Sequence, residues 1–421
     1  MRTMKDSGLS WVGEIPSDWV AHPVYYYFGE RKNKNIFGQE DNLLSLSYGR
    51  VIRKDINTNG GLLPESFNTY NIVEAGDIII RPTDLQNDKK SLRTGLCLER
   101  GIITSAYIAL RPIRRLNSGF FRYLLHAYDI SKVFYNMGNG VRQGLNFSEF
   151  SRLTVFEPPI EIQDKVTQYL DTATAEVDKI ISDIQTQIDT LEQYKRSVIA
   201  ETVTKGLNPD AEMKDSGIEW VGEIPVHWPV HPVYSYYGER KNKNRLGKED
   251  NLLSLSYGRV IRKDINTNDG LLPESFNTYN IVEAGDIIIR PTDLQNDKRS
   301  LRTGLVKEHG IITSAYIDLC PLKQVDSRYF HFLLHAYDVM KVFYNMGNGV
   351  RQGLNYSEFS RLMVFEPPYE EQVAMANYLE TKVTEVDAII EQKKEQMAVL
   401  DAYKRSLIFE YVTGKKEVPV S

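Results

Sequence analysis

The most extended hydrophobic pattern in the sequence lies in residues 159–204, where apolar residues recur every three or four positions. This spacing places them on one face of a helix. A helix of about 40 residues spans roughly 60 Å, and a stripe of about six heptads is typical of a coiled coil. The same pattern returns in residues 368–413, so the expected partner of the stripe is its own copy. The residues of the first stripe are Val166, Leu170, Ala173, Val177, Ile180, Ile184, Ile188, Leu191, Tyr194 and Val198.

The repeat extends over nearly the whole chain. Trp11 recurs 209 positions later as Trp220, and Tyr48 recurs as Tyr257 at the same offset. A period of this length indicates a domain duplication rather than a solenoid. We therefore expect a globular domain in residues 1–158, a long helix in 159–206, a second globular domain in 207–367, and a long helix and tail in 368–421.

Each globular part combines short strand-like runs with one helical segment. The strands are expected at residues 43–47, 78–81, 102–110 and 153–156, and the helix at 119–136. Trp11 and Trp19 are expected packing anchors. The predicted fold class is α+β: a tandem duplication of a mixed α/β domain plus a long helix, with the two helices paired as an antiparallel coiled coil of pseudo-two-fold symmetry.

Composition and charge narrow the possible functions of the protein only a little. The net charge of −5 argues against a nucleic-acid binder that works alone, although it allows local basic faces. No apolar run reaches membrane-spanning length and the N-terminus does not resemble a signal peptide, so the expected location is the cytoplasm. Cys97 and Cys320 occupy non-equivalent repeat positions, so we expect two buried thiols rather than a disulfide or a metal site.

The loops match better between the two copies than core packing would require. Residues 42–96 differ from 251–305 only at Gly60/Asp269 and Lys90/Arg299, and residues 134–146 are identical to 343–355. Solvated loops or a recent duplication are the alternatives, but a shared binding surface explains better why some stretches match and others do not. Three loop segments, 45–54, 81–93 and 139–143, carry Arg, Lys, Asn and Gln side chains of the kind that contact bases and phosphates.

The candidate DNA-binding residues fall in these three segments of each copy, with Arg142 and Gln143 favoured for base reading and Lys89 for phosphate. In the first copy they are Ser47, Tyr48, Arg50, Arg53, Lys54, Arg81, Gln86, Asn87, Lys89, Asn139, Arg142 and Gln143. In the second copy they are Ser256, Tyr257, Arg259, Arg262, Lys263, Arg290, Gln295, Asn296, Lys298, Asn348, Arg351 and Gln352.

The sequence supports an enzyme less well than a nucleic-acid-binding protein. The glycine-rich segment 138–144 has neither dinucleotide-binding nor Walker spacing. His126 and its copy His335 are more simply explained as structural histidines, and Asp84 has no catalytic partner at a recognisable spacing. No catalytic residue, metal site or cofactor is expected in this chain. A duplicated two-site enzyme built around His126 and Asp84, and a coiled-coil scaffold that binds protein, stay open as alternatives.

Several short motifs together resemble the specificity subunits of type I DNA restriction-modification systems. They are the stretch from Trp11 to Trp19, the Pro158-Pro159 pair followed by Gln163 and Tyr169-Leu170, and the sequence YKRSVI at 194–199, each with a copy in the second half. The resemblance covers nearly the whole chain.

This resemblance implies two target-recognition domains separated by two antiparallel helices, which act as a ruler between two DNA half-sites. It implies double-stranded DNA, two methyltransferase subunits and restriction/translocase subunits as partners. S-adenosylmethionine, ATP and magnesium would belong to those partners. Members of this family usually carry two dissimilar recognition domains. The two nearly identical domains here therefore lead us to expect a bipartite, inverted-repeat target with half-sites about one to one and a half DNA turns apart.

Overall fold

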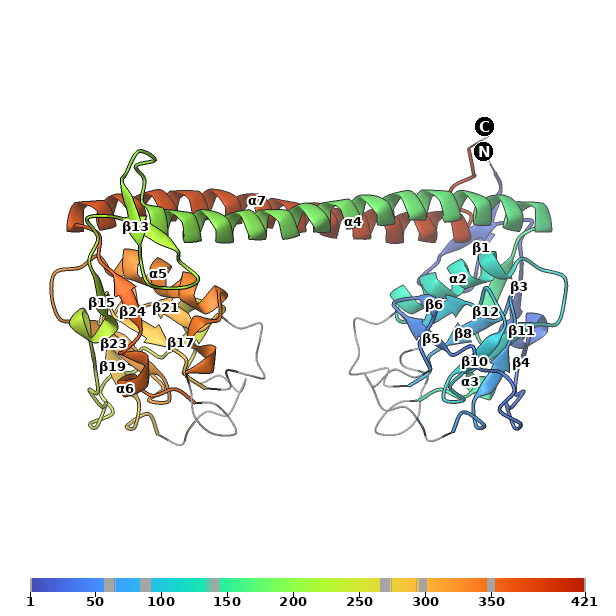
Figure 1. Cartoon of the computed structure of the whole chain (residues 1–421). Coiled ribbons are helices and arrows are strands. Elements are labelled where there is room, and N and C mark those ends of the chain that lie inside the picture. Colours follow the sequence, from blue (N-terminus) through green and yellow to red (C-terminus); the bar gives the residue numbers. More distant parts are fainter. Residues whose placement is uncertain are drawn as a thin grey trace. The chain divides into compact units, whose positions relative to one another are not determined.

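The computed structural model describes residues 2–56, 64, 66–83, 92–133, 135, 137, 144–265, 273, 275–292, 294, 301–346 and 353–419. The chain divides into two compact units (Figure 1). Unit 1 comprises residues 1–184 and 394–421, and unit 2 comprises residues 185–393. The helix α4 (Ile160–Lys205) therefore begins in unit 1 and ends in unit 2, whereas α7 (Tyr369–Val412) begins in unit 2 and ends in unit 1. The four-part domain division expected from the sequence stays a prediction.

The two units have nearly the same order of elements. Unit 1 contains β1 (Met4–Asp6), β2 (Glu14–Pro16), β3 (Val20–Pro23), α1 (Val24–Tyr27), β4 (Phe28–Glu30), β5 (Leu44–Ser47), β6 (Arg50–Arg53), β7 (Asn71–Val73), β8 (Ile78–Ile80), β9 (Thr94–Leu96), β10 (Gly101–Ile103), β11 (Ile108–Pro112), α2 (Ser118–Ile130), α3 (Phe147–Phe150) and β12 (Thr154–Glu157). Unit 2 contains β13 (Met213–Asp215), β14 (Glu223–Pro225), β15 (Val230–Pro232), η1 (Val233–Ser235), β16 (Tyr237–Glu239), β17 (Leu253–Ser256), β18 (Arg259–Arg262), β19 (Asn280–Val282), β20 (Ile287–Ile289), β21 (Thr303–Leu305), β22 (Gly310–Ile312), β23 (Ile317–Pro321), α5 (Ser327–Val339), η2 (Val342–Asn345), α6 (Tyr356–Phe359) and β24 (Met363–Phe365).

An antiparallel four-stranded sheet, in the order β4-β11-β8-β9, lies at the centre of unit 1. The middle strand β8 reads Ile-Ile-Ile because both of its faces are covered. Ile78 and Ile80 pack into the main core under α2, whereas Ile79 points to a smaller core formed with the β5–β6 hairpin. The corresponding sheet of unit 2 has the order β16-β23-β20-β21.

Helix α2 is shorter than its apolar pattern suggests. We expected a helix over residues 119–136, but α2 ends at Ile130. Lys132 adopts a left-handed backbone conformation with φ of 55°, and the amide of Val133 donates to the carbonyl of Tyr128. This arrangement satisfies the last carbonyls of the helix and stops it. At the other end, the side chain of Asn117 caps the amides of Gly119 and Phe120.

The single strand expected over residues 102–110 is also wrong. Two strands occupy this stretch: β10 pairs with β7, and β11 joins the central sheet. Between them the amide of Tyr107 donates to the carbonyl of Thr104, which closes a tight turn. The sequence did not separate the two strands, because only Thr104 and Ser105 interrupt the apolar residues and the residues on both sides of the turn are buried.

The long helices pack in opposite directions within each unit. In unit 1 the rings of Tyr169 and Tyr411 lie 4.6 Å apart, and further along α4 Asp178 accepts from Lys404, which comes earlier in α7. Unit 2 shows the same antiparallel packing. Gln187 of α4 contacts Lys393 of α7, and Lys195, later in α4, contacts Asp387, which comes earlier in α7. The predicted α+β fold, duplicated with long helices, is thus confirmed. A continuous coiled coil and the pseudo-two-fold relationship stay predictions.

The apolar stripe of α4 is only partly buried. Val166, Leu170, Val177, Ile184 and Ile188 are buried as expected. Ile180 and Tyr194 were placed on the same stripe, but each is about half exposed, and so are the copies Ile389 and Tyr403 on α7. A stripe of this width exceeds what one antiparallel partner covers, which leaves its edge residues in contact with solvent.

The predicted packing anchors and cysteines are mostly as expected. Trp19 and Trp228 are fully buried, and Trp11 packs edge-on against Tyr128 with ring centroids 4.5 Å apart. Both cysteines are free thiols, but only Cys97 is buried. Cys320 is partly exposed because it lies near the end of β23, so its predicted burial is wrong. Within the described ranges, no helix combines the length and the apolar character needed to cross a lipid bilayer.

Candidate nucleic-acid interface

The first candidate segment forms a two-residue β-hairpin. Ser47 at the end of β5 faces Arg50 at the start of β6, so Tyr48 and Gly49 make the turn. Both have positive φ angles, 45° and 78°, as a type I′ turn requires. The turn presents the Tyr48 side chain to solvent with an exposed fraction of 77%, and Tyr257 is 80% exposed in the β17–β18 hairpin. Each unit thus displays an aromatic ring at the tip of a rigid turn.

Arg50 connects this hairpin to the long helices. Its Nη2 lies 2.5 Å from Oδ2 of Asp178 on α4, and the other oxygen of Asp178 accepts from Nζ of Lys404 on α7, also at 2.5 Å. In unit 2, Arg259 and Lys195 share Asp387 at 2.6 and 2.7 Å. The Arg50 side chain is nevertheless 70% exposed, so one side of the guanidinium faces solvent. The predicted DNA contact of Arg50 and Arg259 stays a prediction.

Arg53 and Lys54 differ in how much of their charge is neutralised. The Nε of Arg53 lies 2.8 Å from both carboxylate oxygens of Glu99, and this hydrogen bonding holds the pKa of Glu99 below its usual range. Arg262 and Glu308 repeat the pair. Lys54 is exposed and has no ion-pair partner among the described residues, and the same is true of Lys263. The unpaired lysines are therefore the simpler candidates for a phosphate contact.

Most of the other candidate residues lie outside the described residues. Arg81 and Arg290 are described; each is half-buried and is the first residue of the second segment in its copy. The following candidates lie outside the described residues, and their roles stay predictions: Gln86, Asn87, Lys89, Asn139, Arg142 and Gln143, with Gln295, Asn296, Lys298, Asn348, Arg351 and Gln352 in the second copy.

A buried arginine ties together the described ends of these segments. Arg93 is fully buried, and its Nε donates to the hydroxyl of Tyr135 at 2.9 Å. That hydroxyl donates to Asp129 at 2.9 Å, and Nη1 of Arg93 donates to the carbonyl of Thr83. The amide of Leu145 also donates to the carbonyl of Pro82 at 2.9 Å. Residues just outside 84–91 and 138–143 are therefore joined in one network.

This network corrects the expectation for the second segment. The sequence placed Arg93 at the end of a polar surface stretch, whereas the structure buries it, and Arg302 with Tyr344 and Asp338 repeats the arrangement. Burial raises the pKa of Asp129, and the backbone amide of Arg93 and the hydroxyl of Tyr135 oppose that shift. A buried arginine needs such acceptors, since an unpaired charge inside the protein is costly.

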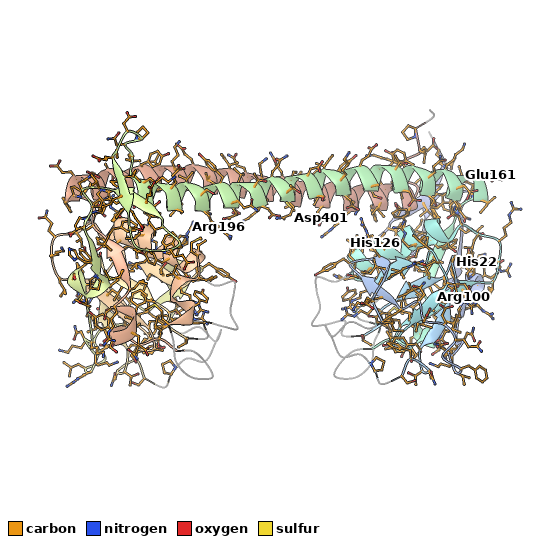
Figure 2. All side chains as sticks on the ribbon, viewed as in Figure 1. His22, Arg100, His126, Glu161, Arg196 and Asp401 are labelled. Atoms are coloured by element: carbon orange, nitrogen blue, oxygen red, sulfur yellow. The ribbon has the colours of Figure 1, made fainter. Side chains whose placement is uncertain are left out.

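The enzyme alternative gains little from the described residues. His126 lies on α2 where this helix faces the long helices (Figure 2), and burial lowers its pKa to about 3. His335 behaves in the same way and borders a pocket of about 380 Å³ with Arg196 and Met340, in which no carboxylate takes part. Both histidines are therefore neutral at physiological pH. Asp84 lies outside the described residues, and in the described part of the chain no three His, Cys, Asp or Glu side chains gather as a metal site.

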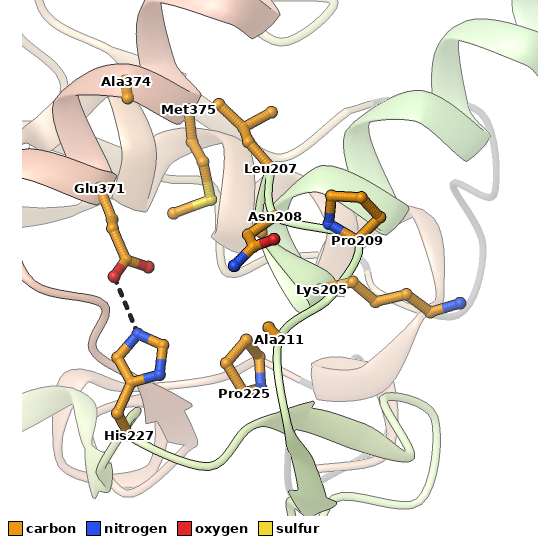
Figure 3. A pocket seen from close by; sticks show the side chains of 11 residues that line it. Lys205, Leu207, Asn208, Pro209, Ala211, Pro225, His227, Glu371, Ala374 and Met375 are labelled. Atoms are coloured by element: carbon orange, nitrogen blue, oxygen red, sulfur yellow. Dashed lines mark hydrogen bonds and ion pairs between the residues drawn. The ribbon is translucent and has the colours of Figure 1, made fainter.

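A second pocket in unit 2, of about 470 Å³, lies between the end of α4 and the start of α7 (Figure 3). At its rim Nε2 of His227 and Oε1 of Glu371 are 2.8 Å apart, and the indole of Trp228 donates to the other carboxylate oxygen at 3.0 Å. These contacts fasten the turn after β14 to the first turn of α7. Since both oxygens of Glu371 are engaged, the pair serves a structural purpose.

Comparisons with known proteins agree with the motif resemblance. The chain is 24% identical to a protein named as a putative type I restriction enzyme MjaX specificity subunit from Methanocaldococcus jannaschii, over 97% of this chain and 96% of that protein. It is 23% identical to the type I restriction enzyme MjaVIII specificity subunit of the same organism, over 76% and 75% of the two chains. No protein-family model matches.

A solved structure has the same fold. It is described as "Structural basis underlying complex assembly and conformational transition of the type I R-M system", and one of its chains superposes with a TM-score of 0.69 at 12% identity, covering 96% of this chain and 99% of that one. The resemblance to type I specificity subunits is thus confirmed. The relatives carry the name of the specificity subunit and not that of a catalytic subunit, in agreement with the expectation that this chain is not an enzyme.

Proposed function

We propose that this chain, similar over almost its whole length to type I restriction specificity subunits, reads a bipartite DNA target and leaves catalysis to its partners. One observation carries the proposal to the residues: each unit presents the same Tyr-Gly turn beside exposed cations. Tyr48 and Tyr257 project from equivalent hairpins, followed by Lys54 and Lys263. An exposed aromatic ring with nearby cations suits contact with bases and phosphates.

Because the surfaces that we propose read DNA are nearly identical in the two units, we expect the two DNA half-sites to be alike. The hairpins β5–β6 and β17–β18 have the same sequence, the same strand register and the same turn angles. Equal surfaces select equal base sequences, so we expect the target to be an interrupted inverted repeat rather than two unrelated half-sites.

Partner subunits would supply the chemistry. We expect two methyltransferase subunits, with S-adenosylmethionine, and restriction/translocase subunits that use ATP and magnesium, all in the cytoplasm. Apolar residues that the helices leave exposed support docking of the methyltransferases: Ile180, Val399 and Tyr403 in unit 1, and Tyr194, Tyr378 and Ile389 in unit 2. Exposed apolar side chains that gather on one element are typical of a protein interface.

Single-molecule mapping of methylated bases tests the proposal. DNA would be sequenced from cells that express this chain together with its methyltransferase, with cells that express the methyltransferase alone as the control. We expect a new split motif with inverted, similar halves. A split motif with unrelated halves would keep the function but remove the argument from equal readers. No new motif, with the methyltransferase shown to be active beside another specificity subunit, would favour a protein-binding scaffold instead.

A further inference from the structure

A basic loop between β4 and β5 lies outside every segment singled out from the sequence. Residues 31–39 contain Arg31, Lys32 and Lys34 and no acidic residue, and residues 240–248 contain five cations and no acidic residue. This concentration stands out in a chain with a net charge of −5. Several of these cations are engaged: Arg31 pairs with the buried Asp77, Lys32 pairs with Glu30, and Lys34 donates to the carbonyl of Thr69, and unit 2 repeats these contacts. Arg245 and Lys248, at the tip of the loop in unit 2, have no ion-pair partner among the described residues.

The frame of the loop is built firmly. Asn35 is buried, its Nδ2 donates to the carbonyl of Glu40 at 2.8 Å, and its Oδ1 accepts from the amide of Glu40 at 3.1 Å. The amide of Gly38 donates back to the carbonyl of Asn35 at 2.9 Å, with Gly38 in a left-handed conformation. Asn244 makes the same two side-chain bonds in unit 2. The four residues between these anchors are therefore held out from the domain.

The tip places an apolar side chain in water. Phe37 is 84% exposed, the largest value for any large apolar side chain in the described part of the chain, and its copy Leu246 is 78% exposed. A single exposed apolar residue is common on protein surfaces. Here it recurs at the same position in both units, on a rigid frame and among cations, which is the composition of side chains that enter or line a DNA groove.

The two copies differ at this tip and nowhere else in the loop. When residues 31–41 are compared with residues 240–250, the residues of the frame are unchanged. The substituted positions are Ile36/Arg245, Phe37/Leu246 and Gln39/Lys248. The substitutions keep an apolar residue at the outermost position and add two positive charges in unit 2. A partner that tolerates this change must present negative charge beside an apolar or stacked surface, as the DNA duplex does.

We propose that the tips 36–39 and 245–248 contact the DNA duplex, with Phe37 and Leu246 against sugars or base edges and with Arg245 and Lys248 on phosphates. This inference rests on the proposed DNA-reading function. It also makes the two units differ in their DNA contacts, because unit 2 contacts the DNA phosphates with two more cations than unit 1.

The salt dependence of DNA affinity tests the phosphate contacts. The full chain, or its complex with the methyltransferase if the chain alone binds too weakly, would be titrated with a duplex at several KCl concentrations. Each phosphate contact contributes about 0.9 to the slope of log affinity against log salt. The double variant R245I/K248Q should lower the slope by up to about 1.8, and I36R/Q39K should raise it by a similar amount. The matched control R111Q/R115Q removes two exposed cations from β11 and the loop that follows it, and should leave the slope nearly unchanged.

The apolar contact has a different signature. F37S and L246S should weaken binding several-fold without changing the slope, because an apolar contact releases no counterion. If the wild-type protein binds or methylates its site and all tip variants match it, the tips do not contact DNA and the inference is wrong. If the tip variants lose a methyltransferase subunit instead of DNA affinity, the tips bind protein and the inference is also wrong. If the wild-type protein and complex neither bind DNA nor direct methylation, the proposed function itself fails.

Discussion

The guanidinium of Arg50 and the carboxylate of Asp178, 128 residues apart in the sequence, lie within 2.5 Å of each other. Asp178 belongs to α4 and is shared with Lys404 of α7, so one carboxylate joins the Tyr48 hairpin to both long helices of unit 1. The hairpin that we propose reads DNA is thereby attached to the helices that we propose bind the methyltransferase.

Replacing Asp178 with asparagine should release Arg50 at little cost to the fold. Arg50 is 70% exposed, so its ion pair contributes about 1 kcal/mol or less to stability. The variant also removes the partner of Lys404, which is less exposed, so the loss of that contact adds to the cost. The freed cation should strengthen non-specific DNA binding, and the loosened hairpin should lower the preference for the target site. Binding of target and random duplexes would be compared by fluorescence anisotropy.

The matched control is Asp183→Asn, since Asp183 is an exposed carboxylate on the same helix with no ion-pair partner among the described residues. It removes the same charge without touching the hairpin. Equal effects of the two variants on target preference would show that the Arg50–Asp178 pair does not position the hairpin.

The buried network around Arg93 gives a second prediction. Tyr135→Phe removes the hydroxyl that Arg93 and Asp129 share, which should cost about 1–3 kcal/mol in the free energy of unfolding. If the network positions the flanking segments for DNA, site-specific affinity should fall more than non-specific affinity. Thermal unfolding and the two affinities would be measured on the same preparation.

Tyr48→Phe serves as the control for that experiment, because Tyr48 is exposed and its hydroxyl is not part of a buried network. It should leave the melting temperature unchanged. A Tyr135→Phe protein that melts earlier but keeps its full target preference at low temperature would reduce Arg93 to a purely structural residue.

A buried carboxyl group in unit 2, which unit 1 lacks at the equivalent position, should make the stability of unit 2 depend on pH. Asp318 on β23 takes the place of Ala109 on β11. Neither of its oxygens accepts a hydrogen bond from the described residues, and its ion-pair partner Arg240 is distant, with Nε 3.9 Å from Oδ2. Burial, with the nearby Asp286, raises the pKa of Asp318 to about 8. In the unfolded chain the carboxyl titrates near 3.9. Between these values the folded protein holds a proton that the unfolded chain has lost, so unit 2 loses stability as pH rises from about 4 to 8.

Asp318→Ala should therefore stabilise unit 2, by an amount on the order of 1–4 kcal/mol at pH 8 and by less near pH 4. The reverse change, Ala109→Asp, should destabilise unit 1 with the same pH dependence. Calorimetric melting at several pH values measures both. A stabilisation of equal size at pH 4 and pH 8 would mean that Asp318 does not change its charge state in this range.

The exposed residues of the long helices give a prediction about assembly. Tyr403→Glu places a charge on the helix face that we propose docks a methyltransferase subunit. Because Tyr403 is about half exposed, the fold should lose about 1 kcal/mol or less. Capture of the methyltransferase, measured by co-purification and by the mass of the complex, should drop sharply. Ala398→Glu adds the same charge at an exposed position of α7 that is turned away from the face of Val399 and Tyr403, and it should leave capture intact.

The sequence predicted the long helices well because their signals are local. Pro159 marks the start of α4 and Gly206 its end, where Gly206 has a φ of 76°. The Tyr48-Gly49 turn was not predicted, since a tyrosine in a left-handed conformation is not a usual turn signal. Residue type alone therefore did not indicate that segment 45–54 is a hairpin.

Burial of polar groups was the harder problem. Arg93 looks like a surface residue in the sequence, and its burial depends on Tyr135 and Asp129, which come 42 and 36 positions later. The same non-local dependence applies to Arg50 and Asp178. The sequence did not single out the tip at Phe37, because the frame that holds it out depends on the side-chain hydrogen bonds of the buried Asn35, which only the structure shows.

The crossing of the long helices between units sets the order in which the chain can fold during its synthesis. Unit 2 is one continuous segment, residues 185–393, and can close as soon as that segment has left the ribosome. The core of unit 1 includes Leu407, Ile408, Tyr411 and Val412, which are made last. Most multidomain proteins complete their N-terminal domain first. In this protein the core of unit 1 cannot be completed until Val412 has left the ribosome, so a chain that stalls earlier keeps part of an apolar core uncovered, which favours aggregation.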